Sequence, residues 1–228
     1  MSAAVEIDSL QFAYPDGFSL AVPTFRLDAS EQVLLAGTSG CGKSTLLHLI
    51  AGLEEAAGGS IAIAGTTIGS LRGAARDAFR GRAIGMVFQT HHLLPGFSAR
   101  ENLLIAMMSS SIPDSERGPR GEALLGAVGL PAPDRDRAAD RLSVGQQQRV
   151  AVARAVAARP ALVLADEPTA SLDPANADAA IVLLRDTCRA AGAALLCTSH
   201  DPAMRSRFDR VVELSSIVRT RTSGGSTA

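Results

Sequence analysis

The sequence has few cysteines, and their placement excludes two kinds of cross-linked protein. Cys41, Cys188 and Cys197 are the three cysteines of the 228-residue chain, an odd number without CxxC spacing. Disulfide frameworks and zinc sites use paired, regularly spaced cysteines, so this pattern argues against both. We therefore expect three reduced thiols.

The chain has no large excess of positive or negative charge, and it has no long hydrophobic run. Its formal net charge is −1 with 20% charged residues, which provides no basic field for counterion-driven binding, so we expect no nucleic-acid partner. Hydrophobic residues make up 46% of the chain but occur in short runs such as 46–50, far below the length of a membrane span. The N-terminal segment MSAAVEIDSL has no basic region before an apolar stretch and does not resemble a secretory signal. These features predict a cytoplasmic chain.

Apolar runs alternate with helical patterns along the sequence. Strands are expected at 5–7, 33–36, 61–65, 161–165 and 193–198, and helices at 43 to about 53, about 145–158 and about 175–189. Repeated alternation of strand and helix is typical of a parallel sheet covered by helices. The pattern predicts an α/β protein with a mainly parallel sheet.

The segment from 90 to about 158 differs in composition from its surroundings. Residues 109–119 are rich in serine and proline, and helical patterns occupy about 101–108 and 122–128. We interpret the segment as a helical insert within one domain of residues 1–214. The polar composition of residues 215–228 predicts a disordered tail.

A glycine-rich pattern with the form of a phosphate-binding loop follows the strand expected at 33–36. It consists of Gly37, Thr38, Ser39, Gly40, Cys41, Gly42, Lys43 and Ser44, and Thr45 follows it. Glycines let backbone amides face phosphate oxygens, and the next helix points the positive end of its dipole at them. Lys43 adds charge for the β- and γ-phosphates, and the Ser44 hydroxyl suits Mg²⁺. An ordinary strand-to-helix turn is the alternative, but the flanking strand and amphipathic helix favour nucleoside triphosphate binding.

Two carboxylates follow the apolar strand expected at 161–165. Asp166 is placed to hold the metal, commonly through water, and Glu167 to polarise the attacking water as general base. In isolation such a pair is often a solvated turn at the end of a strand. After a phosphate-binding loop it indicates nucleotide hydrolysis.

The stretch RLSVGQQQR at 141–149 resembles the LSGGQ signature of ATP-binding-cassette (ABC) ATPases, with Val144 in place of the first glycine. In that family the signature grips the γ-phosphate of a nucleotide bound to the other protomer. The resemblance therefore implies that Ser143, Gly145 and Gln146 contact ATP held by a second copy of the chain. The effect of Val144 on this grip stays open.

Further elements of that family appear in order between Tyr14 and about residue 214. The resemblance implies that Tyr14 stacks on adenine and that Gln89 contacts metal and water. It also implies that Asp173, in the D-loop-like Ser171-Leu172-Asp173, reaches across the dimer and that His200 hydrogen-bonds the γ-phosphate. Taken singly, such residues are more often core, exposed or capping side chains. The implied cofactors are ATP and Mg²⁺, the implied metal contacts are Ser44, Gln89 and Asp166, and the implied catalytic side chains are Glu167, His200 and Gln89.

The resemblance implies a P-loop NTPase fold of the ABC-ATPase type. That fold has a mainly parallel sheet core, an antiparallel β subdomain and an inserted helical subdomain. Residues 80–103 are similar to the branch with lipoprotein-release, macrolide-exporter and cell-division ATPases. In this branch the ATPase lies at the cytoplasmic face of the inner membrane and acts on separate permeases, which implies ATP-driven export or extraction of a substrate. A cell-division or envelope-regulating complex without a transported substrate is the alternative.

Two further classes of protein fit the sequence less well. ABC ATPases that act on chromosomes or ribosomes carry a long coiled-coil insertion or two cassettes, whereas only 54 positions separate Gln89 from Ser143 here. An unrelated P-loop kinase or GTPase would lack the signature at 141–149. Both features favour a transporter-type ATPase.

Overall fold

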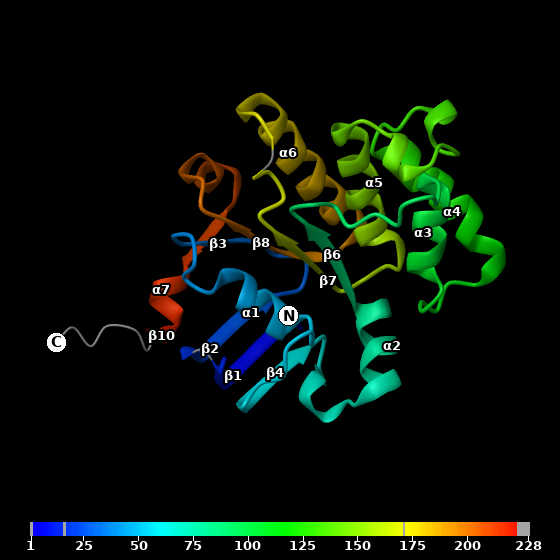
Figure 1. Ribbon diagram of the computed structural model, residues 1–228. Coiled ribbons are helices and arrows are strands. Elements are labelled where there is room, and N and C mark those ends of the chain that lie inside the picture. The colour runs from blue at the N-terminus through cyan, green and yellow to red at the C-terminus, as the bar shows by residue number, and fades with distance from the viewer. Residues whose placement is uncertain (1, 16, 171, 223–228) are drawn as a thin grey trace.

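The computed structural model describes residues 2–15, 17–170 and 172–222, which form two sheets and a set of helices (Figure 1). The first sheet has five strands in the order β6-β7-β8-β3-β9, and every neighbouring pair is parallel. Its strands are β3 (Gln32–Ala36), β6 (Ile84–Phe88), β7 (Leu162–Asp166), β8 (Ala194–Ser199) and β9 (Arg210–Glu213). The expected parallel sheet is confirmed.

The second sheet has the order β10-β2-β1-β4-β5 and is antiparallel throughout. Its strands are β1 (Ala3–Ala13), β2 (Phe18–Asp28), β4 (Gly58–Ile63), β5 (Thr66–Thr67) and β10 (Arg219–Thr222). Buried side chains alternate with exposed ones along β1 at Val5 and Ile7 and, after a register shift between Asp8 and Gln11, at Leu10 and Phe12, as expected of a sheet with one face against a core. This sheet is the antiparallel part that the family resemblance implied.

Helix α1 (Lys43–Ile50) packs between the two sheets. Leu46, Leu47, Leu49 and Ile50 are fully buried in one apolar cluster with residues from both sheets. Burying a leucine or isoleucine stabilises a fold by roughly 1.5–3 kcal/mol per side chain. The helix that follows the phosphate-binding loop is therefore fixed firmly between the sheets.

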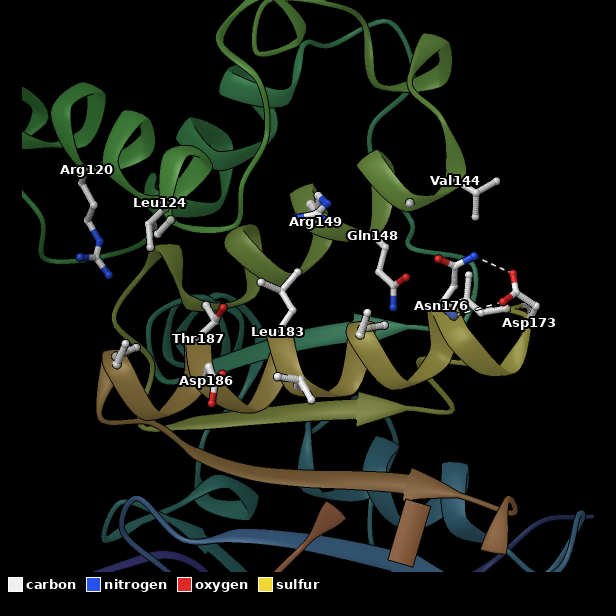
Figure 2. Close-up of a pocket in the computed structure, with 18 residues that line it drawn as sticks. Arg120, Leu124, Val144, Gln148, Arg149, Asp173, Asn176, Leu183, Asp186 and Thr187 are labelled. Carbon is white, nitrogen blue, oxygen red and sulfur yellow. Dashed lines mark hydrogen bonds between the residues drawn. The ribbon is translucent and has the colours of Figure 1, made fainter. Parts of the chain in front are cut away.

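Three helices lie between β6 and β7 in sequence and gather to one side of the parallel sheet (Figure 1). They are α3 (Ala99–Met107), α4 (Asp114–Ala127) and α5 (Val144–Ala157), and short 3-10 turns at 132–134 and 139–141 connect the last two. A second apolar cluster joins them to β7, β8 and α6 (Pro174–Ala191). A groove of about 1130 Å³ runs between α4, α5 and α6 (Figure 2).

The remaining helices are short or peripheral. Helix α2 (Gly73–Ala83) precedes β6 and follows a 3-10 turn at 68–70, another 3-10 turn spans Pro202–Arg207, and α7 (Leu214–Ile217) follows β9. In the described part of the chain, no helix has the length and apolar character needed to span a lipid bilayer.

Two expected helix boundaries are wrong. Helix α1 ends at Ile50, because the chain turns at Gly52 with φ +66°, instead of reaching about residue 53. Helix α4 starts at Asp114 instead of about residue 122 and contains Pro119. The acidic residues in its first turn interact favourably with the positive end of the helix dipole, which stabilises this earlier start. Asp114 also forms an ion pair with Arg117 at 2.9 Å.

The predicted disorder of residues 215–228 is also wrong over its first part. Residues 214–217 form α7, and 219–222 pair with β2 as an antiparallel edge strand. Leu214 is fully buried, and Ile217 and Val218 pack against the core, so a few apolar side chains anchor a segment of polar composition. The rest of the predicted tail, 223–228, lies outside the described residues.

Candidate functional site

The phosphate-binding loop connects the end of β3 to the start of α1. Gly42 precedes the first residue of α1 with φ +104°, a conformation that side chains disfavour. A Cβ atom at this position would lie 2.9 Å from Cζ of Phe18. Glycine is therefore required here for both backbone conformation and space.

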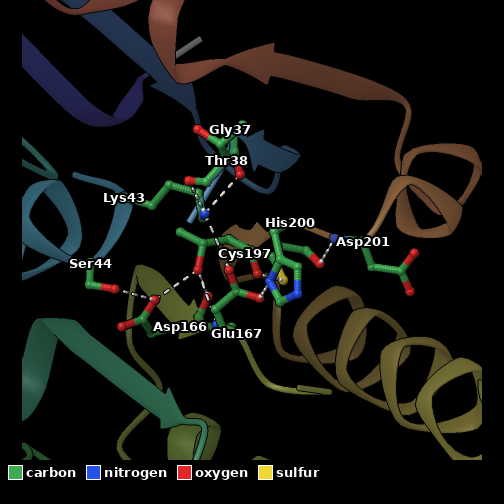
Figure 3. A network of polar contacts seen from close by, with 12 residues as sticks. Gly37, Thr38, Lys43, Ser44, Asp166, Glu167, Cys197, His200 and Asp201 are labelled. Atoms are coloured by element: carbon green, nitrogen blue, oxygen red, sulfur yellow. Dashed lines mark hydrogen bonds and ion pairs between the residues drawn. The ribbon is translucent and has the colours of Figure 1, made fainter. Parts of the chain in front are cut away.

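Lys43 is buried at the base of the loop, with 5% of its side chain exposed. Its Nζ donates to the carbonyl oxygens of Gly37 at 2.8 Å and Thr38 at 3.0 Å, and lies 3.3 Å from Oε1 of Glu167 (Figure 3). The ammonium group is thus held at the centre of the loop. A phosphate seated on the loop amides would lie within reach of this charge.

One carboxylate oxygen beside the loop accepts hydrogen bonds from two hydroxyl groups. Oδ1 of Asp166, at the end of β7, accepts hydrogen bonds from Ser44 Oγ at 3.0 Å and from Thr198 Oγ1 at 2.8 Å. Among the described residues, no group of three or more His, Cys, Asp or Glu side chains is arranged to hold a metal. Hydroxyl and carboxylate oxygens nevertheless suit Mg²⁺, which takes few protein ligands and completes its shell with water and substrate phosphates.

Glu167 adopts a left-handed backbone conformation, with φ +46°. Its amide donates to Thr198 Oγ1 at 3.0 Å, and its Oε2 lies 2.9 Å from Nδ1 of His200. Non-glycine residues pay roughly 1–3 kcal/mol for such a conformation, and it clusters at functional sites. In this conformation the carboxylate lies between Lys43 and His200, and 16% of the side chain is exposed.

Lys43, Ser44, Glu167 and His200 open onto a cleft of about 600 Å³. The residues that line it are Tyr14, Phe18, Ser39, Gly40, Gly42, Lys43, Ser44, Thr45, Gln89, Glu167, Ala170 and His200. At one end Tyr14 donates to Oε1 of Glu54 at 3.2 Å, and its ring meets Phe12 edge to face at 4.6 Å. The cleft therefore has aromatic side chains at one end and the charged loop at the other. A nucleotide, whose nucleobase is linked to phosphates, needs both kinds of surface.

Sequence reasoning missed Phe18, Thr198 and Ala170. Phe18 follows Tyr14 closely in the sequence, and aromatic character at the start of β2 was the available signal. Thr198 reaches Asp166 because the two residues are register partners on neighbouring strands. We find no sequence signal for Ala170.

The signature residues lie apart from this cleft. Ser143 caps α5, where its Oγ accepts from the Gln146 amide at 3.3 Å and the Gln146 side chain accepts from the Ser143 amide at 2.9 Å. Asp173 caps α6 and accepts from the Asn176 amide at 3.1 Å. Gly145 and Asp173 line the groove of Figure 2, and none of the four predicted contacts (Ser143, Gly145, Gln146, Asp173) is among the described residues that line the cleft. Ser171 lies outside the described residues.

The exposed N-terminus of α5 has the features of an anion-binding end. Ser143, Val144 and Gly145 are exposed, and α5 contains 14 residues whose dipoles add at that end. Val144, which occupies the first-glycine position of the resembled signature, is 54% exposed. Within one chain, this helix end therefore faces outward rather than into the phosphate cleft.

The chain is similar to a known protein family and to known proteins. Residues 20–170 match the family model described as ABC transporter. The lipoprotein-releasing system ATP-binding protein LolD of Anaeromyxobacter dehalogenans is 50% identical over 189 residues, covering 82% of this chain and 78% of that protein. LolD of Cereibacter sphaeroides is 41% identical over 221 residues, covering 94% of this chain and 97% of that protein.

Solved structures show the same fold. The dimeric post-hydrolysis state of the ATP-binding cassette MJ0796 bound to ADP and Pi superposes with a TM-score of 0.78 at 28% identity, covering 97% of this chain and 99% of that chain. The cbiO1 protein of Clostridium perfringens, part of the ABC transporter complex cbiONQ, has a TM-score of 0.77 at 26% identity, covering 88% and 80%.

Proposed function

The chain belongs to the ABC transporter ATP-binding family and is an ATPase, and we propose that it powers lipoprotein release through a separate membrane permease. The observation that carries the proposal is one cleft lined by Lys43, Ser44, Glu167 and His200, in which Ser44 donates a hydrogen bond to Asp166. The lipoprotein substrate is supported by the names of relatives that are 39–50% identical to this chain.

Substrate binding would use the aromatic end and the loop together. In this proposal Tyr14 stacks on adenine, and the amides of the phosphate-binding loop, with Lys43, hold the phosphates. Lys43 exchanges its loop carbonyls and Glu167 for phosphate oxygens, which frees the carboxylate. Ser44, Gln89 and Asp166 would hold Mg²⁺, which when bound would neutralise charge on the phosphates.

Hydrolysis would then run through Glu167. Its carboxylate accepts a proton from water, the water oxygen bonds to the γ-phosphorus, and the bond from that phosphorus to the bridging oxygen breaks to release ADP and phosphate. His200 orients Glu167 and, when ATP is bound, also hydrogen-bonds the γ-phosphate. General-base catalysis of this kind contributes about 10² to 10⁴ in rate.

The site would be completed by a second copy of the chain. Each copy presents the α5 end, with Ser143, Gly145 and Gln146, to the γ-phosphate held by the other copy, and Asp173 lies at the same junction. The dimeric state of the MJ0796 cassette supports this arrangement. ATP binding closes the two copies, and hydrolysis reopens them.

The dimer would act at the cytoplasmic face of the inner membrane as a peripheral subunit. Purification from detergent-solubilised membranes tests the partner, and we expect an integral permease with a large extracytoplasmic domain to co-purify. In reconstituted vesicles the complex should release a bound lipoprotein only when ATP is hydrolysed. ATP hydrolysis that the partner stimulates, without release of any lipoprotein, would instead favour the cell-division or envelope-regulating alternative.

A further inference from the structure

Arg154 connects the signature helix to the loop that follows Gln89. It lies in α5, where Nη1 donates to the carbonyl oxygen of His92 at 2.5 Å and Nη2 to that of His91 at 2.7 Å. These two carbonyls belong to consecutive residues, so one planar guanidinium spans both.

The loop that Arg154 holds has an unusual backbone. His91 and His92 have φ values of +59° and +45°, and two consecutive side-chain-bearing residues rarely adopt this conformation. The His91 amide donates to the carbonyl oxygen of Phe88 at 3.0 Å, and the His92 ring lies over the Phe88 ring with centroids 4.5 Å apart. The loop is thus fixed to β6 on one side and to Arg154 on the other.

Arg154 serves these carbonyls without a matching carboxylate. No Asp or Glu in the described part of the chain lies within ion-pair distance of its guanidinium, whose pKa is lowered by desolvation. A charged donor kept from water forms strong hydrogen bonds to neutral acceptors and is costly to leave unpaired. The contact therefore has the strength to hold a strained loop in one conformation.

Helix α5 carries both Arg154 and, at its start, the signature residues. A helix rises about 1.5 Å per residue, so Arg154 lies roughly 16 Å along the axis of α5 from the Ser143 cap. Gln89 immediately precedes the restrained loop and lines the cleft. We propose that Arg154 is a positioning residue that sets Gln89 in the cleft and couples its loop to the signature helix. This inference rests on the proposed role of Gln89 in hydrolysis.

The test compares Arg154→Met with a matched change at Arg120. Arg120 of α4 also donates to two consecutive carbonyls, those of Val156 at 2.9 Å and Ala157 at 2.7 Å, but at the far end of α5. Each substitution keeps an apolar stem and removes one two-carbonyl contact. We would measure kcat and KM for MgATP, thermal stability, and amide hydrogen exchange of residues 89–94.

Arg154→Met should lower kcat about tenfold with KM changed less than about twofold. The reason is that a displaced Gln89 weakens contacts that are made mainly in the transition state. Exchange at 89–94 should rise about tenfold, and Arg154→Lys, which keeps a donor, should recover part of both effects. Arg120→Met should leave kcat and exchange at 89–94 within about twofold of wild type even if the melting temperature falls.

Wild-type kcat in Arg154→Met, or an equal loss of kcat in both Met variants, would overturn the proposal. No recovery in Arg154→Lys would overturn it as well. If Arg154→Met does not fold, kcat and exchange at 89–94 are compared between Arg154→Lys and wild type. A wild-type chain without ATPase activity would count against the proposed function instead. In that case the exchange comparison still tests whether Arg154 restrains the loop.

Discussion

Nδ1 of His200 lies 2.9 Å from Oε2 of Glu167, although the two residues follow different strands of the parallel sheet. His200 is 56% exposed and Glu167 16% exposed, so the histidine stands at the mouth of the cleft and the carboxylate lies deeper. Since a γ-phosphate would enter from the mouth, His200 is placed to contact the substrate and the proposed base together.

Replacing His200 with alanine should lower kcat by about 10² or more while ATP still binds, because the base loses its orienting partner and the γ-phosphate loses a hydrogen bond. Single-turnover hydrolysis and fluorescent-nucleotide binding measure the two effects. Asp201→Asn is the control, since Asp201 caps the following 3-10 turn through the Ala203 amide and does not line the cleft. A kcat within twofold of wild type would remove His200 from the proposed mechanism.

Ser44→Ala should raise the Mg²⁺ concentration needed for half-maximal ATPase activity. The change removes the hydroxyl that donates to Asp166 and leaves one fewer hard oxygen in the cleft. Titration of Mg²⁺ at fixed ATP measures the shift. Ser44→Thr keeps the hydroxyl and should resemble wild type, and equal Mg²⁺ dependence in all three proteins would contradict the assignment.

Two glycine-to-alanine changes should alter stability in opposite directions. A Cβ at Gly85 would lie 1.9 Å from the carbonyl oxygen of Ala155, so β6 and α5 would have to separate. Gly85→Ala should reduce the free energy of unfolding by about 3 kcal/mol or more. Gly121→Ala, inside α4, would bring a Cβ no closer than 3.9 Å to Met107 Cε and should raise it by about 0.5–1 kcal/mol. Urea denaturation measures both, and loss of similar size in the two variants would contradict this packing.

The buried thiols predict how stability and labelling depend on pH. Burial raises the pKa of Cys188 from 9.0 to about 12 and raises that of Cys197 as well. Their contribution is complete below the unfolded-state pKa near 9.0 and is lost as pH rises through the folded-state value, since the unfolded chain ionises first. The free energy of unfolding should therefore fall between about pH 9 and 12.

In the native protein at pH 8, iodoacetamide should label half-buried Cys41 and leave Cys188 and Cys197 unmodified until unfolding. Labelling of Cys41 should also stop ATP hydrolysis, since this residue lies in the phosphate-binding loop. Peptide mass analysis alongside ATPase assays would reveal either native labelling of the buried pair or full activity after labelling of Cys41, and each would contradict the corresponding statement.

The sequence predicts those parts of the site that are contiguous in the chain. The phosphate-binding loop needs glycines, a lysine and a serine within eight positions, and the acidic pair ends an apolar strand, so local patterns carry both. Thr198 could not be predicted in the same way. Its contact with Asp166 comes from the register of β8 against β7, and register is a tertiary property.

The fold shows the same division between local and long-range information. Alternation of strands and helices predicted the parallel sheet, whereas composition failed at 215–222, where Leu214 and Val218 anchor a polar segment. Composition averages over a window and so conceals the few apolar side chains that decide whether a segment docks. Arg154 escaped prediction for a related reason, because its acceptors are backbone carbonyls about sixty positions away.

In the proposed mechanism, each ATP site needs the signature of a second copy. Glu167→Gln keeps the shape of the cleft but removes the proposed base, so MgATP should bind without being hydrolysed and trap the closed pair. Light scattering coupled to size exclusion measures this directly. At saturating MgATP the variant should elute with twice the 23.5 kDa mass of the chain, and with MgADP at the mass of one chain. A variant that binds MgATP yet stays at the single-chain mass would contradict the claim.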